Sequence, residues 1–243
     1  MLILAVLAFG TVTQQDIAAA QNGERVVRAI ETGRQDEVAF RAVVRLPITL
    51  PAYLDRLRKG TLYRANNSVT AIGRFSEIPS VNDVPARLNP PELLEAIVKF
   101  ENSGSSAECP EFLRDRLPEG CRYLAGHEMS KGLDDFYLWT ELSFGFKPMT
   151  RVAQLSIWQL KPGEAIVLTR QIYANRYFDS SLQIDYLASD GDGVYLMTHN
   201  YGRSGWLSGI TGKLIRPIVV SRTLALTDKT LETAINDLRS ERK

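Results

Sequence analysis

The chain has 243 residues, of which 44% are apolar and 23% are charged, an ordinary composition for a folded globular protein. Its 29 basic and 28 acidic residues give a formal net charge of +1, so the composition provides no electrostatic footprint for nucleic-acid binding. The length is enough for one sizeable core, and we expect a single domain over residues 24–243.

Residues 1–20 have the composition of a targeting segment. Residues 2–9 are uninterrupted apolar sequence, and Ala18, Ala19 and Ala20 follow a polar stretch. An apolar core before an A-x-A pattern is typical of a secretory signal, here with cleavage after Ala20. The apolar run is far shorter than the roughly 20 residues of a membrane span. We expect export, with membrane association through an N-terminal anchor as an alternative; an ordinary N-terminal helix would leave the chain in the cytoplasm.

The first strand is predicted by apolar side chains at every second position from Val38 to Leu46. A short helix should begin near Pro51, because proline is tolerated in the first helical turn, and end at Gly60. Residues 69–75 have the composition of another short strand.

Residues 76–132 interrupt this pattern, and we interpret them as a helical and loop insertion of the same domain. Prolines and polar turn formers crowd residues 76–91, and short helices are expected over 91–101 and 110–117, with Pro118 ending the second. Both cysteines of the chain, Cys109 and Cys121, lie here. In an exported chain they could form a disulfide, whereas in a cytosolic chain we expect two unrelated thiols.

The second half of the chain predicts an antiparallel meander followed by helix. About five strands at short intervals are expected over residues 136–146, 152–160, 165–173, 181–188 and 194–201. From Leu207 onward the apolar residues step by three and four positions, which predicts a long helix crossing the sheet. Pro217 should kink this helix or begin a new segment, and Thr227 with Asp228 offers a cap for a second helix.

This order of elements resembles the helix-grip fold of the START and birch-pollen-allergen-like superfamily, SRPBCC, over roughly residues 36–239. The stretches "RQIYANRYFDSSLQIDYL" and "YLMTHNYGRSGWLSGITGKLIRPIV" are similar to segments of uncharacterised exported bacterial members. The resemblance implies an α+β fold, in which a curved antiparallel sheet wraps around a long C-terminal helix. It also implies an apolar cavity for a lipid, sterol, polyketide or other aromatic molecule, and a periplasmic location.

Glycines at 202, 205, 209 and 212 precede the apolar part of the predicted helix. Each glycine inside a helix costs roughly 0.5–1 kcal/mol relative to alanine. We expect Gly202 and Gly205 to be turn residues. Gly209 and Gly212 should let the helix approach the sheet closely or leave volume for a ligand.

Arg170 is the most informative candidate for a ligand contact, because it shares strand parity with Ile166 and Leu168. A buried guanidinium needs a partner, and in a cavity it could bind a ligand carboxylate or phosphate bidentately. The structural alternative is an internal ion pair with Asp185 or Glu141. The predicted ligand-binding residues are Arg170, Trp139, Trp158, Tyr173, Tyr186, Leu196, Gly209 and Gly212; the aromatic members could equally be ordinary core.

Several partial motifs do not qualify as cofactor or metal sites. Lys131 stands where a zinc-protease helix beginning at His127 needs its second histidine, and residues 190–193 lack most ligands of a calcium loop. Trp206 replaces the final glycine of a nucleophile elbow. With neither a Walker loop nor a dinucleotide fingerprint, we expect no cofactor and no metal.

Three functional hypotheses follow. The first is non-catalytic binding of a hydrophobic small molecule or lipid between the sheet and the C-terminal helix. The second is a helix-grip enzyme of the cyclase, hydrolase or dehydratase kind, which requires Arg170, His199 and Asp185 to converge on the cavity. The third is an envelope interaction module, in which the 76–132 insertion docks a partner and the cavity is vestigial. No nucleic-acid partner is expected in any of them.

Overall fold

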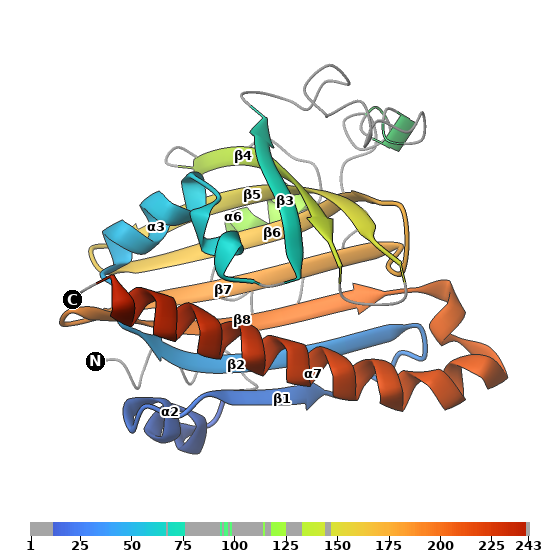
Figure 1. Ribbon diagram of the computed structural model, residues 1–243, viewed down its shortest axis with the longest axis horizontal. Coiled ribbons are helices and arrows are strands. Elements are labelled where there is room, and N and C mark those ends of the chain that lie inside the picture. Colours follow the sequence, from blue (N-terminus) through green and yellow to red (C-terminus); the bar gives the residue numbers. More distant parts are fainter. Residues whose placement is uncertain are drawn as a thin grey trace.

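Eight antiparallel strands form one sheet in the spatial order β1-β2-β8-β7-β6-β5-β4-β3 (Figure 1). This computed structural model describes residues 12–66, 68–75, 118–124, 133–143 and 147–241, with positions 93, 95, 96, 98 and 114. The strands are β1 (Val26–Ile30), β2 (Glu37–Leu46), β3 (Val69–Phe75), β4 (Leu133–Leu142), β5 (Met149–Lys161), β6 (Glu164–Ala174), β7 (Ser180–Asp190) and β8 (Gly193–Arg203).

The predicted strands are all present, and the meander β4 to β8 pairs each strand with its neighbour in the chain. β2 pairs with β8, so the first predicted strand closes against the last one. β1 was not predicted, because most of its residues are only partly buried or exposed, in a pattern without a clean alternation. Gly163 and Gly191 adopt positive φ values of 85° and 59° in the two tight turns of the meander.

Helices cover both faces of this sheet. One face carries α3 (Leu50–Arg58), the 3₁₀ turn η1 (Thr61–Ala65) and α7 (Gly209–Ser240). Residues of α3 and α7 share a core with alternate residues of β2, β5 and β8. The opposite face packs against α2 (Gln14–Gln21) and is also contacted by α6 (Pro118–Leu124), which lies behind the sheet in Figure 1. Both faces are therefore buried. No described helix combines the length and apolar composition needed to cross a bilayer.

α6 is a helix of the predicted insertion that the sequence did not indicate. It begins at Pro118, as expected for a residue whose missing N–H is harmless in the first turn. The expected helix over 110–117 lies almost entirely outside the described residues. Cys121, within α6, is disulfide-bonded. Its predicted partner Cys109 lies outside the described residues, as does most of the 76–132 segment.

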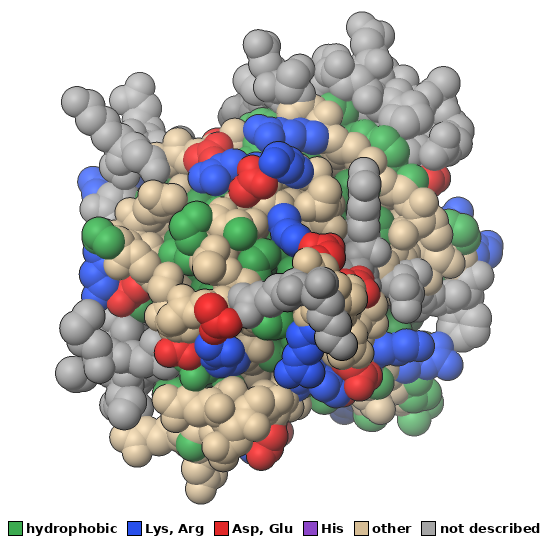
Figure 2. Space-filling view, turned by 60° about the vertical axis from the view of Figure 1, so that its left-hand side comes forward, with side chains coloured by type: hydrophobic (Ala, Val, Ile, Leu, Met, Phe, Trp, Pro, Cys, Tyr) green, Lys and Arg blue, Asp and Glu red, His purple; other side chains and the backbone are tan. Residues whose placement is uncertain are grey.

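α3 forms as its sequence predicts, with Thr49 at the N-cap, proline in the first turn and Gly60 at a φ of 70° just after its end. Its basic side chains are paired with acidic ones: Lys59 with Asp55 at 2.7 Å, and Arg56 with Glu241 at the end of α7. Figure 2 shows basic and acidic side chains next to one another on this side of the molecule. The pair between Arg56 and Glu241 links α3 to the C-terminal end of α7.

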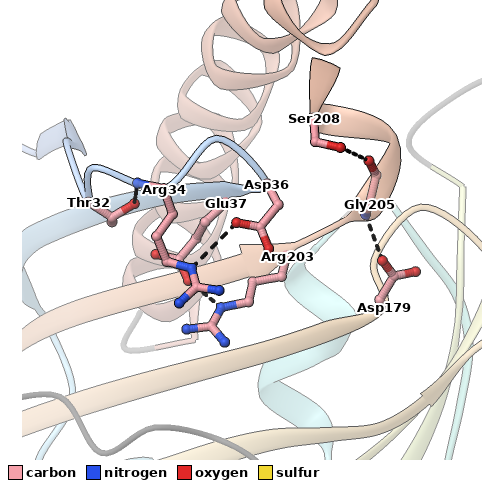
Figure 3. Close-up of polar contacts among 8 residues, drawn as sticks. All are labelled: Thr32, Arg34, Asp36, Glu37, Asp179, Arg203, Gly205 and Ser208. Atoms are coloured by element: carbon pink, nitrogen blue, oxygen red, sulfur yellow. Dashed lines mark hydrogen bonds and ion pairs between the residues drawn. The ribbon is translucent and has the colours of Figure 1, made fainter.

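The connection from β8 to α7 is held by polar contacts from three segments (Figure 3). Arg203 Nε donates to Glu37 Oε2 at 2.7 Å, which joins the end of β8 to the start of β2. The backbone N–H of Gly205 donates to Asp179 Oδ2 at 2.7 Å, and Ser208 Oγ donates to the Gly205 carbonyl at 2.6 Å. These contacts fix where α7 leaves the sheet.

α7 is one continuous helix of 32 residues, so Pro217 does not begin a new segment and Thr227 and Asp228 do not cap one. The predicted apolar stripe is buried only in its C-terminal half. Leu231, Ile235 and Leu238 are 9%, 7% and 5% exposed, but Ile210, Leu214 and Ile218 are 83%, 74% and 56% exposed. The first turns of α7 extend beyond the ends of the strands (Figure 1).

The glycines near the start of α7 have local roles that differ from the predicted ones. Gly209 has a φ of 73°, and a Cβ there would have no neighbour within 4 Å, so this glycine serves the backbone conformation at the helix start. A Cβ on Gly212 would overlap the carbonyl oxygen of Leu207. Gly202 is a strand residue that accommodates the ring of Phe178, not a turn residue. None of these glycines marks a close contact between α7 and the sheet.

The substitution Gly212→Ala tests this local packing. We expect it to lower the free energy of unfolding by about 1–3 kcal/mol, because backbone rather than a flexible side chain must move to make room. Gly205→Ala is the matched control, because its Cβ would meet only Asp179 at an ordinary 3.6 Å. Chemical denaturation of both variants gives the comparison, and equal destabilisation by the two substitutions would contradict the account.

Candidate functional site

A cavity of about 340 Å³ lies between the sheet and the middle of α7. Its roof is formed by α7 through Thr223, Leu226, Thr227, Thr230 and Leu231. Tyr53 of α3 and Tyr63 of η1 are part of its wall, and the strands provide the rest. The volume is at the lower end of the roughly 300–1,000 Å³ typical of small-molecule sites.

The strands give this cavity both apolar and polar lining. Alternation places Ala153 and Leu155 of β5 on the cavity face, and Leu196 of β8 lines it as well. Polar side chains lie beside them on the neighbouring strand, with Gln171 opposite Ala153 and Thr169 opposite Leu155. The other polar lining residues of the strands include Ser181, Gln183, Thr198 and Asn200. A molecule that carries both apolar and polar groups therefore matches the lining.

Asp185 is the acidic group of the cavity and is 5% exposed. Its carboxylate accepts from Thr198 Oγ1 at 2.7 Å and from Gln183 Nε2 at 2.9 Å, and Asn200 in turn donates to Gln183 Oε1 at 3.2 Å. Burial raises the pKa of Asp185 to about 6, although these hydrogen bonds act in the opposite direction. The carboxyl group therefore changes charge close to neutral pH.

Arg151 is the basic group of the cavity lining. Its Nη2 donates to Ser181 Oγ at 3.2 Å, and burial lowers the pKa of its guanidinium. Tyr63 lies near both charged groups, and burial raises the pKa of its hydroxyl to about 12. Arg151 stays charged at neutral pH, because arginine does not lose its proton in proteins, and Tyr63 stays neutral there.

Of the eight predicted ligand-binding residues, the structure places only Leu196 in this cavity. Trp158 and Tyr186 belong to the core on the opposite face, together with residues of α2. Trp139 and Tyr173 pack in a third cluster with Phe75. Gly209 and Gly212 lie at the start of α7, away from the cavity lining. The predicted set is therefore not one site.

Arg170 also lies on the face opposite the cavity, 8% exposed. Its Nη2 donates to Gln154 Oε1 at 2.6 Å, and Gln154 Nε2 donates to Asp135 Oδ2 at 2.7 Å. Of the two internal partners expected for Arg170, Asp185 lies on the cavity face, where Thr198 and Gln183 bind its carboxylate. The guanidinium of Arg170 is therefore connected to the carboxylate of Asp135 through the side-chain amide of Gln154.

The three groups of the enzyme hypothesis do not converge. His199 is fully buried and stands opposite Ile184 in the pairing of β7 with β8, whereas Asp185, one residue on, projects from the other face. Burial lowers the pKa of His199 to about 4, and the nearby Arg41 acts in the same direction. His199 and Arg170 thus share a face, while Asp185 lines the cavity on the other one.

Sequence reasoning missed Arg151, although a usable pattern was present. Arg151 alternates with Ala153, Leu155 and Ile157, which is the same kind of pattern that drew attention to Arg170. A charged residue in phase with apolar neighbours marks a buried charge in both cases. Alternation alone could not tell which of two buried faces encloses the cavity.

Comparisons with known proteins identify the fold. No protein-family model matches the sequence, and a search of curated proteins found no match. Among solved structures, a STAR-related lipid transfer protein from Xanthomonas axonopodis is similar at 13% identity and a TM-score of 0.54, over 88% of this chain and 93% of that chain. The chain has the helix-grip fold. This confirms the predicted fold class and the resemblance to START and SRPBCC proteins.

Two further comparisons have lower scores. A protein of Thermus thermophilus is 10% identical with a TM-score of 0.46, over 84% of this chain and 99% of that one. A START superfamily protein from Mycobacterium smegmatis is 10% identical with a TM-score of 0.44, over 82% and 98%.

The raised pKa of Asp185 predicts a pH dependence of stability. Because the folded state holds this proton up to about pH 6 and the unfolded chain only to about pH 4, the contribution of Asp185 to stability falls as pH rises between these values. Asp185→Asn removes this pH-dependent contribution, so the variant should gain stability relative to the unsubstituted protein as pH rises. The difference in the free energy of unfolding, variant minus unsubstituted protein, should increase by about 2 kcal/mol from about pH 4.5 to about pH 7.5.

Urea denaturation at both pH values measures this difference. Comparing variants is necessary because His199, whose pKa is lowered, contributes with the opposite sign over much of the same range. The exposed carboxyl of Asp55 on α3 provides a control through Asp55→Asn. A difference for Asp185→Asn that does not change with pH would show that the carboxyl is not desolvated as described.

Proposed function

We propose that the protein binds a small hydrophobic molecule or lipid, without chemically transforming it, in the cavity between the sheet and α7. The observation that carries this proposal is the cavity itself, about 340 Å³ of space under the middle of a helix whose two ends are held. A lining in which apolar side chains are interspersed with hydrogen-bonding groups is typical of small-molecule sites.

The similarity in fold adds support. One solved structure with a TM-score above 0.5 is named as a lipid transfer protein, and it matches most of this chain. Its sequence identity of 13% makes the transfer of function to this chain a proposal that depends on the cavity. The separation of Asp185 from Arg170 and His199 favours binding over the enzyme hypothesis in the form in which it was stated.

Blocking the cavity from its roof tests the proposal. Thr230→Trp places a large side chain at a lining position of α7 and should abolish the retention of hydrophobic compounds. Lys229→Trp, the exposed neighbour on the same helix, should retain them. Native mass spectrometry and solvent extraction of the purified proteins measure co-purified ligand, and a panel of lipids measures the shift in melting temperature.

Two results would contradict the binding proposal. One is an unsubstituted protein that carries no ligand and whose melting temperature ignores the panel. The other is equal retention of ligand by Thr230→Trp and Lys229→Trp, which would place the ligand elsewhere.

We also propose that the protein is exported to the periplasm, with residues 13–21 kept as part of the domain. The disulfide at Cys121 supports an oxidising compartment. Asp16 of α2 is fully buried, with its carboxylate 3.0 Å from Arg41 Nη2 and 3.3 Å from Arg28 Nε. Cleavage after Ala20, itself fully buried, would remove this carboxylate and leave Arg41 without it.

This proposal predicts the N-terminus of the mature protein. Intact-mass analysis of protein from the periplasmic fraction should give a chain that begins upstream of Thr13. A mature chain that begins at Gln21 would show that α2 is dispensable, and recovery from the cytoplasmic fraction alone would contradict export.

A further inference from the structure

Arg151 differs from most of the other strand arginines in its surroundings. Four of those arginines have a carboxylate oxygen within 3.3 Å, namely Arg28, Arg41, Arg45 and Arg203. Arg151 lines the cavity, yet among the described residues it has no carboxylate at ion-pair distance, and its Nε is buried without a hydrogen-bond partner. Its charge is therefore not compensated by the described part of the protein.

The hydrogen bonds around Arg151 do not supply a negative charge either. Arg151 donates to Ser181 Oγ, Ser181 donates to Gln171 Oε1 at 3.2 Å, and Gln171 Nε2 donates to the carbonyl of Phe178 at 2.9 Å. Every group in this chain is neutral except the guanidinium. Arg151 is half-buried and its Nε is fully enclosed. A cation removed from water to this extent without a counter-ion costs free energy, and arginine does not escape this cost by losing its proton.

The acidic group of the cavity is engaged elsewhere. Asp185 accepts hydrogen bonds from Thr198 and Gln183, and no described contact joins it to Arg151. The cavity lining therefore has a cationic position and a separate carboxylate position. An anion is attracted to the first and repelled by the second, which would orient it within the cavity.

We propose that the cavity selects a single-chain amphiphile with an anionic head group, a carboxylate or a phosphate monoester, and that Arg151 binds this head group. The guanidinium presents paired N–H donors that match the oxygens of either anion. The apolar part then lies against Ala153, Leu155 and Leu196. A volume of about 340 Å³ fits one short chain rather than a two-chain lipid. This inference rests on the proposed function.

Titration calorimetry with three ligands of the same chain length tests the inference: decanoate, decyl phosphate and decanol. The unsubstituted protein should bind at least one anion about 10- to 100-fold more tightly than the alcohol, the range expected for charge-assisted hydrogen bonds. Comparing decanoate with decyl phosphate distinguishes the two head groups. Arg151→Gln should remove the preference for the anion and keep the affinity for decanol within about threefold.

Two further variants keep the result interpretable. Arg151→Lys keeps the charge without the paired donors, so it should retain part of the anion preference even where Arg151→Gln does not fold. Arg34→Gln removes one exposed positive charge that is not part of the cavity lining and should bind all three ligands as the unsubstituted protein does.

The failures are distinguishable. Binding of none of the three ligands by the unsubstituted protein would overturn the proposed function together with this inference. Equal binding of decanol and both anions, or an anion preference that survives in Arg151→Gln, would overturn the role of Arg151 alone. An anion preference lost equally in Arg34→Gln would show general charge attraction rather than a site.

Discussion

α7 is fixed at both of its ends and spans the cavity between them, and the proposed site depends on this arrangement. At its start, the hydrogen bond from Gly205 to Asp179 and the buried side chain of Leu207 hold the helix. Near its end, Ile235 and Leu238 pack into the core shared with α3 and the sheet. The cavity lies beneath the middle of the helix, between these two sets of contacts.

Much of the fold could be predicted from the sequence, because its determinants are local. The alternation of β2, the proline and glycine that bound α3, and the glycines of the tight turns all act within a few residues. β1 has no such pattern and is held by pairing with β2, a contact that single-sequence reasoning does not supply. At the start of α7 the opposite occurs: Ile210 and Leu214 follow the helical period that predicts a buried face, but their side chains are exposed.

The candidate site could be predicted only in part. The sequence showed that a charge at Arg170 falls among buried positions, and the same argument applies to Arg151. Which of them meets the cavity depends on the face that α7 covers, and both faces of this sheet are buried. On the face away from the cavity, Arg170 reaches Asp135 through Gln154. On the cavity face, Arg151 has no such carboxylate among the described residues, and this difference carries the functional argument.

An experimental electron-density map of the purified protein tests the central claim most directly. The account predicts a resolved space between the middle of α7 and strands β5 to β8, with elongated density that approaches Arg151 in protein saturated with a bound amphiphile. A map in which Thr223 and Thr227 pack directly on the strands, with no room between them, would contradict the account.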